Sequence, residues 1–230
     1  MGTFVFAGIS VLLSVALFIV WSRWRTAARA DYIRGYMFPR GLLDRFGVKR
    51  PELSLKERQL VARGLRQYFL AHLKSGCKFV SMPSQVADDL WHEFILYTRH
   101  YETFCNEAFG GFMHHTPAVV LGEDRQNNAG LRRCWWFCCR EENINPKAAT
   151  RLPLLFSLDE KLKINNGFRY APDCRGVRSG DGGSVHCGGD MSSSSFDGTT
   201  DGFGDSSSSF GDASSSDSGG DGGGGCGGGD

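Results

Sequence analysis

The stretch Ser84-Gln-Val-Ala-Asp-Asp-Leu-Trp-His-Glu-Phe-Ile-Leu-Tyr-Thr-Arg-His-Tyr-Glu-Thr-Phe-Cys-Asn-Glu-Ala108 decides the fold that this sequence predicts. It reads as one helix over residues 84–108, with Ser81 or Ser84 as its cap and Gly110-Gly111 beyond its end. At 100° per residue one broad apolar face contains Val86, Leu90, Phe94, Tyr97, Tyr101, Phe104 and Cys105. A second apolar group on the other side comprises Trp91, Ile95 and Leu96. Because a helix that is apolar on two sides is usually buried, we expect it at the centre of a helical domain.

Asp88 and His92 lie one turn apart between these apolar groups, whereas Asp89, Glu93 and His100 form a narrow strip expected to face water. Buried polar groups need partners, which leaves two interpretations. In the structural one, the Asp88 carboxylate accepts a hydrogen bond from a His92 ring nitrogen, or both side chains bind nearby loop amides. In the functional one, the two residues belong to a metal site or an acid–base pair.

A metal site would need a third protein ligand, and His114-His115 is its candidate source. This dipeptide follows Gly110-Gly111-Phe112-Met113 and precedes Pro117, so the loop can fold back onto the helix. The candidate ligands are therefore Asp88, His92, His114 and His115, and the candidate cofactor is a divalent metal such as zinc. The motif HExxH is absent because Leu96 stands where its second histidine would be, and no phosphate-binding or nucleophile-elbow motif occurs.

The rest of the body also predicts a mainly α fold. Ser54-Leu-Lys-Glu57 is a capping box that opens a helix over residues 55–75, which ends before Gly76. Further helices are expected over 123–142 and 152–163, followed by a short strand over 168–170. Three cysteines near two Trp and a Phe are expected to be core residues rather than ligands: Cys134, Cys138 and Cys139.

Residues 4–21 predict a transmembrane helix after a short N-terminus of residues 1–3. They contain no charge and would span about 27 Å as a helix, close to a hydrocarbon core of about 30 Å. Four arginines follow within about 15 residues: Arg23, Arg25, Arg29 and Arg34. This bias predicts a single span with the N-terminus outside and the body in the cytoplasm. The alternatives are a buried core helix and a signal peptide cleaved near Ala28-Arg29-Ala30.

Residues 22–53 are expected to be a basic juxtamembrane linker before a helical domain over 54–172. Arg40, Arg45, Lys49 and Arg50 would lie near an anionic leaflet, or serve only as a topology signal. In a cytoplasmic body all eight cysteines would be thiols, including Cys77.

Residues 173–230 predict a disordered tail rich in Gly, Ser and Asp. The 31 glycines of the chain concentrate there, and the tail has 2 Arg against 10 Asp. Residues 1–172 have 24 Lys and Arg against 15 Asp and Glu, so the tail is acidic and the body basic. The tail would fold back on the body, meet a protein partner, or remain solvated. This division excludes a uniform soluble enzyme and a collagen, and no pattern indicates nucleic-acid binding.

Asp88-Asp-Leu-Trp-His-Glu-Phe94, with Tyr101, Cys105 and His114-His115-Thr-Pro117, resembles the core of the glycine-rich domain-containing protein-like family. The resemblance is closest to short bacterial members with a membrane anchor and a Gly-rich tail. Longer members have a second histidine shortly after Trp-His, where this chain has Phe94. The structural core of the motif would be Leu90, Trp91, Phe94, Tyr101 and Cys105.

The family has no established catalytic activity. The sequence therefore favours a membrane-anchored interaction or scaffold module, whose protein partner would bind the helical domain or the acidic tail. The alternative is a metal-binding or metal-dependent protein centred on Asp88, His92 and His114 or His115.

Overall fold

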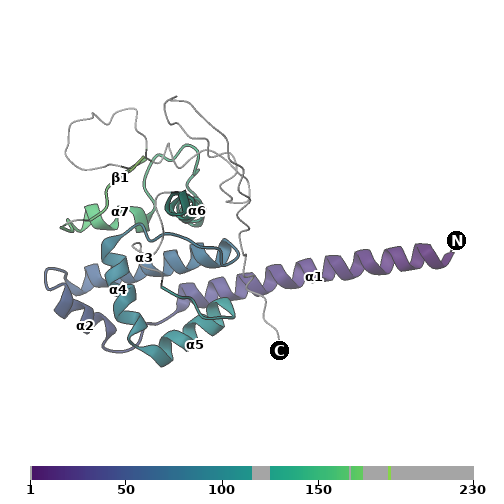
Figure 1. The fold of residues 1–230 in the computed structure, drawn as a ribbon, viewed down its shortest axis with the longest axis horizontal. Helices are drawn as coiled ribbons and strands as arrows, with labels where there is room; N and C mark the ends of the chain where they lie inside the picture. Colours follow the sequence, from purple (N-terminus) through teal and green to yellow (C-terminus); the bar gives the residue numbers. More distant parts are fainter. Residues whose placement is uncertain (1, 116–124, 166, 173–185, 188–230) are drawn as a thin grey trace, which may run out of the picture.

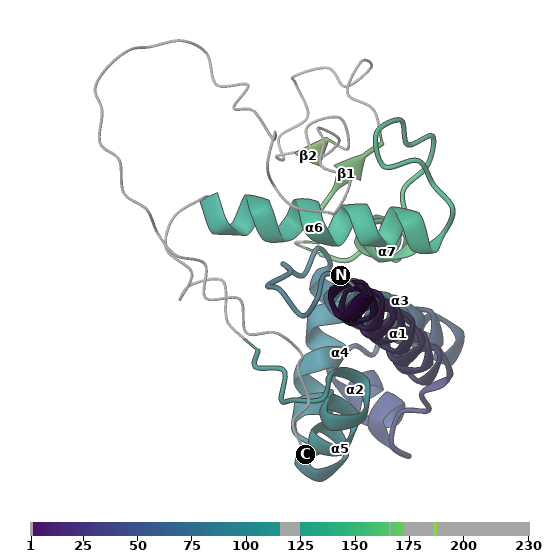
Figure 2. The same cartoon turned by 90° about the vertical axis from the view of Figure 1, so that its right-hand side faces the viewer.

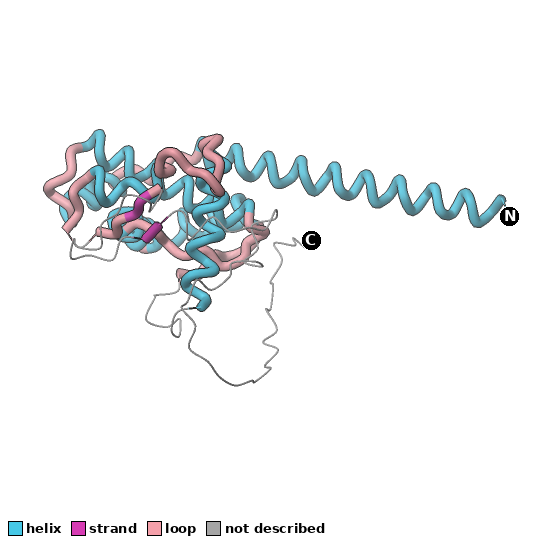
Figure 3. Tube along the Cα trace, turned by 90° about the horizontal axis from the view of Figure 1, so that it is seen from above, coloured by secondary structure: helices cyan, strands magenta, loops and turns pink. Residues whose placement is uncertain are grey.

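The computed structural model describes residues 2–115, 125–165, 167–172 and 186–187, and it confirms a mainly helical protein. Seven helices lie in these ranges: α1 (Gly2–Gly35), α2 (Leu42–Lys49), α3 (Leu55–Lys74), α4 (Gln85–Ile95), α5 (Thr98–Phe109), α6 (Arg125–Glu141) and α7 (Leu154–Lys161). A parallel pair of two-residue strands, β1 (Tyr170–Ala171) and β2 (His186–Cys187), completes them (Figure 3). Apart from β2, the predicted tail lies outside the described residues.

Helix α3 is the centre of the domain, and α1, α2, α4, α6 and α7 all pack against it (Figure 1). Its start is the predicted capping box: the Ser54 hydroxyl accepts from the Glu57 amide, and the Glu57 carboxylate accepts from the Ser54 amide. Val61, Leu65 and Phe69 are fully buried along one side. On another side of α3, Gly64 lets α7 approach closely, since a Cβ at Gly64 would collide with Leu158 of α7.

Helix α1 runs without a break from the predicted span into the domain. Its last turns carry Ala30 and Ile33, which are buried, and the Tyr32 ring stacks 6.1 Å from Phe104 of α5. Residues 22–35 are therefore helical and residues 30–33 pack in the core, where the sequence analysis expects a linker. The arginines that alternate with these apolar positions hide the buried face from composition alone.

Helix α2 also lies in the segment expected to be a linker. Leu42, Phe46 and Leu53 of this region are buried in the main core, at 2% exposure or less. The domain thus includes residues 30–53. The basic residues between these positions face acidic partners on α4, so a solvent-exposed composition conceals a packed helix.

The helix expected over 84–108 is two helices, and that expectation is wrong at one point. Helix α4 ends at Ile95, Leu96 is 57% exposed, and α5 begins at Thr98. In a straight helix Phe94 and Tyr101 would be about 10 Å apart along the axis. The bend instead brings their rings to 5.3 Å, and Phe94 also lies 5.5 Å from Phe104. Burial of Phe94, Tyr101 and Phe104 in one aromatic cluster thus offsets the lost helical hydrogen bonds.

Asp159 of α7 joins three parts of the fold. Its buried carboxylate accepts hydrogen bonds from the Ser84 hydroxyl at 2.7 Å, from the Gln85 amide at 2.7 Å and from the Val86 amide at 3.2 Å. It also accepts from the Phe168 amide at 2.9 Å. An anionic acceptor at a helix start satisfies amides that have no intrahelical partner and complements the helix dipole.

The described cysteines include both buried thiols and a disulfide-bonded residue. Cys134, Cys138 and Cys139 of α6 are fully buried core residues, as predicted, and burial raises the pKa of the Cys139 thiol to about 12. Burial also raises the pKa of the Cys138 thiol, so Cys138 and Cys139 favour packing over metal binding. Cys77 differs from the expectation of eight thiols, because it is disulfide-bonded.

We expect Asp159→Ala to lower the free energy of unfolding by about 3 kcal/mol, because it leaves buried donors at the start of α4 without an acceptor. Chemical denaturation of the full chain in detergent, followed by circular dichroism, measures this loss. The control is Glu160→Ala, an exposed neighbour on the same helix, which should change stability by less than about 0.5 kcal/mol. Equal stabilities of the two variants would contradict this role of Asp159.

Candidate metal centre

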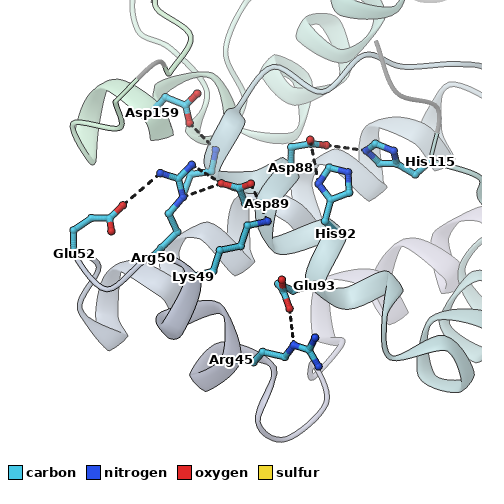
Figure 4. A network of polar contacts seen from close by, with 11 residues as sticks. Arg45, Lys49, Arg50, Glu52, Asp88, Asp89, His92, Glu93, His115 and Asp159 are labelled. Carbon is cyan, nitrogen blue, oxygen red and sulfur yellow. Dashed lines mark hydrogen bonds and ion pairs between the residues drawn. The ribbon is translucent and has the colours of Figure 1, made fainter. Parts of the chain in front are cut away.

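Asp88, His92 and His115 converge at the side of α4 (Figure 4). The Asp88 Oδ1 atom lies 3.0 Å from His115 Nε2, and Oδ2 lies 3.4 Å from His92 Nδ1. One ligand atom from each residue can be chosen so that all lie within 4.8 Å of one another. The two imidazole rings are 4.3 Å apart between centroids. The structure thus brings together three of the four predicted ligands.

The third ligand is delivered by the loop after α5. Tyr101 donates a hydrogen bond to the Met113 carbonyl at 2.6 Å, and the Trp91 indole donates to the Tyr101 hydroxyl at 3.2 Å. The His115 ring then packs at 4.5 Å against the Trp91 ring, edge to face. Aromatic side chains of α4 and α5 therefore set the position of His115 opposite Asp88.

His114 does not take part in the cluster. It is exposed, and its ring packs at 4.8 Å against Phe112. The open choice between His114 and His115 is decided by the direction of the loop, because successive side chains of an extended segment point to opposite sides. Pro117, which the sequence analysis expects to end this loop, lies outside the described residues.

The cluster is more open than expected. The exposed side-chain fractions are 23% for Asp88, 16% for His115 and 44% for His92. The sequence analysis expects Asp88 and His92 to be surrounded by apolar residues, but Leu96 is 57% exposed after the end of α4 and His92 lies at the surface. One side of the cluster is therefore accessible from solvent.

One of the ligand-atom separations suits a shared ion, whereas the Asp88–His115 pair at 3.0 Å is an ordinary hydrogen bond. Two ligand atoms on one tetrahedral zinc ion, each bound at about 2.0–2.2 Å, lie about 3.4 Å apart. The Asp88–His92 separation of 3.4 Å matches this distance and exceeds the usual 2.7–3.2 Å of an N–H···O bond. Two imidazoles and a carboxylate are also a donor set that zinc and ferrous iron accept in proteins.

Asp89, expected to face water, is 7% exposed and belongs to a second network. Arg50 donates to its Oδ2 through Nε at 2.8 Å and also through a second guanidinium nitrogen, and Lys49 Nζ lies 3.2 Å from its Oδ1. One turn further along α4, the Glu93 carboxylate binds Arg45 at 2.8 Å (Figure 4). The basic residues 45–50 thus bind α4, where the sequence analysis places them near a leaflet.

Sequence reasoning missed this network although its signal is present. Arg45 and Lys49 are four residues apart on α2, and Asp89 and Glu93 are four residues apart on α4. Complementary charges at the same helical spacing indicate two helices that pack side by side. The network holds α2 against the face of α4 next to the cluster.

The five residues assigned to the structural core of the motif are all buried, with exposures of 0–3%: Leu90, Trp91, Phe94, Tyr101 and Cys105. Burial raises the pKa of the Cys105 thiol. A protonated, buried thiol supports packing here rather than ligation.

Comparisons with known proteins give one match. A family model described as UCP032817-like matches residues 28–191, which is more than half of the chain. No curated protein and no solved structure matches. The resemblance to the glycine-rich domain-containing proteins stays a prediction.

We expect the two histidines to contribute differently to stability. His92→Ala should change the free energy of unfolding by less than about 0.5 kcal/mol, because its side chain is more exposed than that of His115 and has no hydrogen bond to Asp88 within 3.2 Å. His115→Ala should cost about 1–2 kcal/mol, because it removes the contact with Trp91 and the hydrogen bond to Asp88. Denaturation of metal-free protein measures both, with the exposed His100→Ala as control. A larger loss for His92→Ala than for His115→Ala would contradict the geometry.

Proposed function

We propose that this chain, which belongs to the UCP032817-like family, is a membrane-anchored protein that binds one divalent metal ion. The observation that carries the proposal is the convergence of Asp88, His92 and His115, whose ligand atoms lie within 4.8 Å of one another. The alternative is the interaction or scaffold module that the sequence favours. A folded protein that binds no metal would support this alternative.

The ion would be a transition metal, with zinc as the first candidate. Three protein ligands leave at least one coordination position for water or another small ligand, which is the arrangement of exchangeable rather than purely structural sites. The exposed side of His92 supplies the access that such a position needs. A zinc ion held in this way would polarise a bound water or carbonyl group.

Asp88 has two roles in this proposal: it is a ligand of the ion, and it orients the two histidines. In the metal-free protein its Oδ1 faces His115 Nε2 and its Oδ2 faces His92 Nδ1, so the carboxylate orients both imidazoles toward the place that the ion would occupy. The aromatic support of His115 by Trp91 and Tyr101 restricts the loop, while His92 is set by its place one helical turn from Asp88.

We expect the purified full chain to bind about one equivalent of zinc, measured by elemental analysis after removal of free metal. Asp88→Asn, His92→Ala and His115→Ala should each lower the affinity by about tenfold or more, since each removes one of three ligands. His114→Ala is the matched control, because His114 adjoins His115 in sequence and faces away from the cluster. Folded protein that binds no metal, or equal losses for His114→Ala and His115→Ala, would overturn the assignment.

The membrane anchor rests on α1. The segment Phe6–Gly35 is one helix that is long and apolar enough to cross a membrane, and large apolar side chains such as Leu12 and Phe18 are exposed along it. Cleavage near Ala28 would remove most of a helix whose next turns carry the buried Ala30 and Ile33. The packing of α1 thus supports a retained span rather than a cleaved signal peptide.

Two observations bear on the orientation of the domain. The arginines after the span favour a cytoplasmic domain, whereas the disulfide at Cys77 is typical of an oxidising compartment. We give more weight to the arginines, because flanking positive charge acts directly on insertion. Four buried cysteines also remain thiols: Cys105, Cys134, Cys138 and Cys139.

We expect a green fluorescent protein fused after Asp230 to fluoresce in bacterial cells, and an alkaline phosphatase fused there to be inactive, because both would lie in the cytoplasm. The control variant carries three lysines inserted after Met1, which weakens the charge bias and should raise the phosphatase signal. An active phosphatase on the unmodified chain would place the domain outside and assign the Cys77 disulfide to that compartment.

A further inference from the structure

Two neighbouring arginines lie on α1 where its apolar segment meets the domain. Trp21, Arg25 and Arg29 follow one another along one side of this helix at intervals of four residues. Side chains at this spacing are neighbours, with Cβ atoms about 5–6 Å apart. The two guanidinium groups are close enough to repel each other. Two positive charges thus lie side by side just before α1 enters the core at Ala30.

Each guanidinium group is held by a contact that is not a hydrogen bond. The Arg25 group lies over the Trp21 ring, 5.2 Å from its centroid. Helix α5 lies beside α1, which Figure 2 shows from its N-terminal end. The Arg29 group packs against Gly110 at the carboxyl end of α5, where a Cβ would collide with it. A cation at this end of a helix is also favoured by the helix dipole.

Within the part of the chain that the structure describes, neither guanidinium group has a hydrogen-bond acceptor or an ion-pair partner. The Glu107 carboxylate of α5 attracts Arg29 without pairing with it. By contrast, Arg34 on the same helix binds Asp31 and Glu141. A guanidinium group has five N–H donors in a fixed planar arrangement. Arg25 and Arg29 therefore present donors that an external anion can use.

The height of the pair relative to a bilayer follows from the rise of α1. The apolar side chains of Leu17 and Val20 are 70% and 65% exposed, and the Trp21 ring suits the edge of the hydrocarbon core. Arg25 lies four residues, or about 6 Å, beyond Trp21 along the helix. The headgroup layer of one leaflet is about 5–8 Å deep. Arg25 is thus inside this layer, and the Arg29 side chain leans back toward it, because helix side chains tilt toward the N-terminus.

The ligand chemistry that fits this pair is a phosphate group. Planar guanidinium groups bind phosphate oxygens through paired, charge-assisted hydrogen bonds. A phospholipid with a net negative charge suits two adjacent arginines better than phosphatidylcholine, whose own cation they would repel. Its acyl chains would lie along the exposed apolar side chains of the preceding turns of α1.

We infer that Arg25 and Arg29 form a binding site for the phosphate group of one anionic phospholipid in the bilayer that α1 spans. Trp21 positions the first arginine, and the absence of a side chain at Gly110 leaves room for the second. This inference rests on the proposed membrane anchor and is independent of the metal centre. It gives a binding role to two arginines that the sequence analysis uses only to orient the span.

Native mass spectrometry of the delipidated full chain in detergent tests the site, with phosphatidylglycerol, phosphatidylcholine and inorganic phosphate as separate probes. We expect one phosphatidylglycerol per chain, bound about tenfold more tightly than phosphatidylcholine, because only the former lacks a cation of its own. Inorganic phosphate should bind more weakly still, since it has no acyl chains to bury. Inorganic phosphate that binds as tightly as phosphatidylglycerol would overturn the assignment to a lipid.

Arg25→Gln and Arg29→Gln should each lower the affinity for phosphatidylglycerol about tenfold, because each removes charge-assisted hydrogen bonds to the phosphate. Arg23→Gln is the matched control. It removes the same charge from an exposed position of the same helix and should change the affinity less than about twofold. Equal losses at positions 23, 25 and 29 would show attraction by net charge alone and would reject the site.

Two further measurements separate the possible failures. Arg25→Lys and Arg29→Lys keep the charge and the long side chain, so they guard against a disturbed fold, and each should still weaken binding because lysine lacks the paired donors. Flotation of the chain with phosphatidylglycerol vesicles tests the anchor by itself. A chain that floats but retains no phosphatidylglycerol would refute the site and leave the anchor intact. A chain that does not float would refute the anchor and the site together.

Discussion

The Asp159 carboxylate binds the start of α4 and fixes the rotation of this helix about its own axis. The candidate site depends on that rotation. The carboxylate binds the Ser84 hydroxyl and the amides of Gln85 and Val86, so α4 cannot turn about its axis without breaking charge-assisted hydrogen bonds in a buried place. The neighbours Asp88 and Asp89 make the consequence plain. They point about 100° apart, one toward His115 and one toward Arg50. A rotation by one residue would exchange their surroundings and break both networks.

The bend between α4 and α5 serves the same site from the other end. It lets Phe94, Tyr101 and Phe104 share one cluster, and it places Tyr101 where its hydroxyl binds the Met113 carbonyl. His92, a turn before the bend, has 44% of its side chain exposed. The turn of the chain at Leu96 and Tyr97 thus serves both the aromatic core and the loop that carries His115.

Local patterns predicted those parts of the fold that depend on neighbours in sequence. The Ser54–Glu57 capping box, the burial of Cys138 and the candidate pair Asp88–His92 belong to this class. The remainder depends on distant partners. The bend at Leu96 was missed because the apolar positions of α4 and α5 continue one helical period, and the burial of Asp89 was missed because Arg50 lies 39 residues away. Nothing local distinguishes His114 from His115, since the direction of their loop is set by Tyr101.

The loop after α5 joins the two features proposed for this protein. Gly110 lies against Arg29 of α1, and His115, five residues later, faces Asp88 of α4. Five residues span at most about 17 Å, so the end of the loop at α1 and the end at the cluster cannot move independently over larger distances. Tyr101 and Trp91 hold the loop near its middle. In the proposed membrane-anchored protein, the continuous helix α1 would therefore set the height of the domain and, through this loop, the distance of the candidate metal centre from the bilayer.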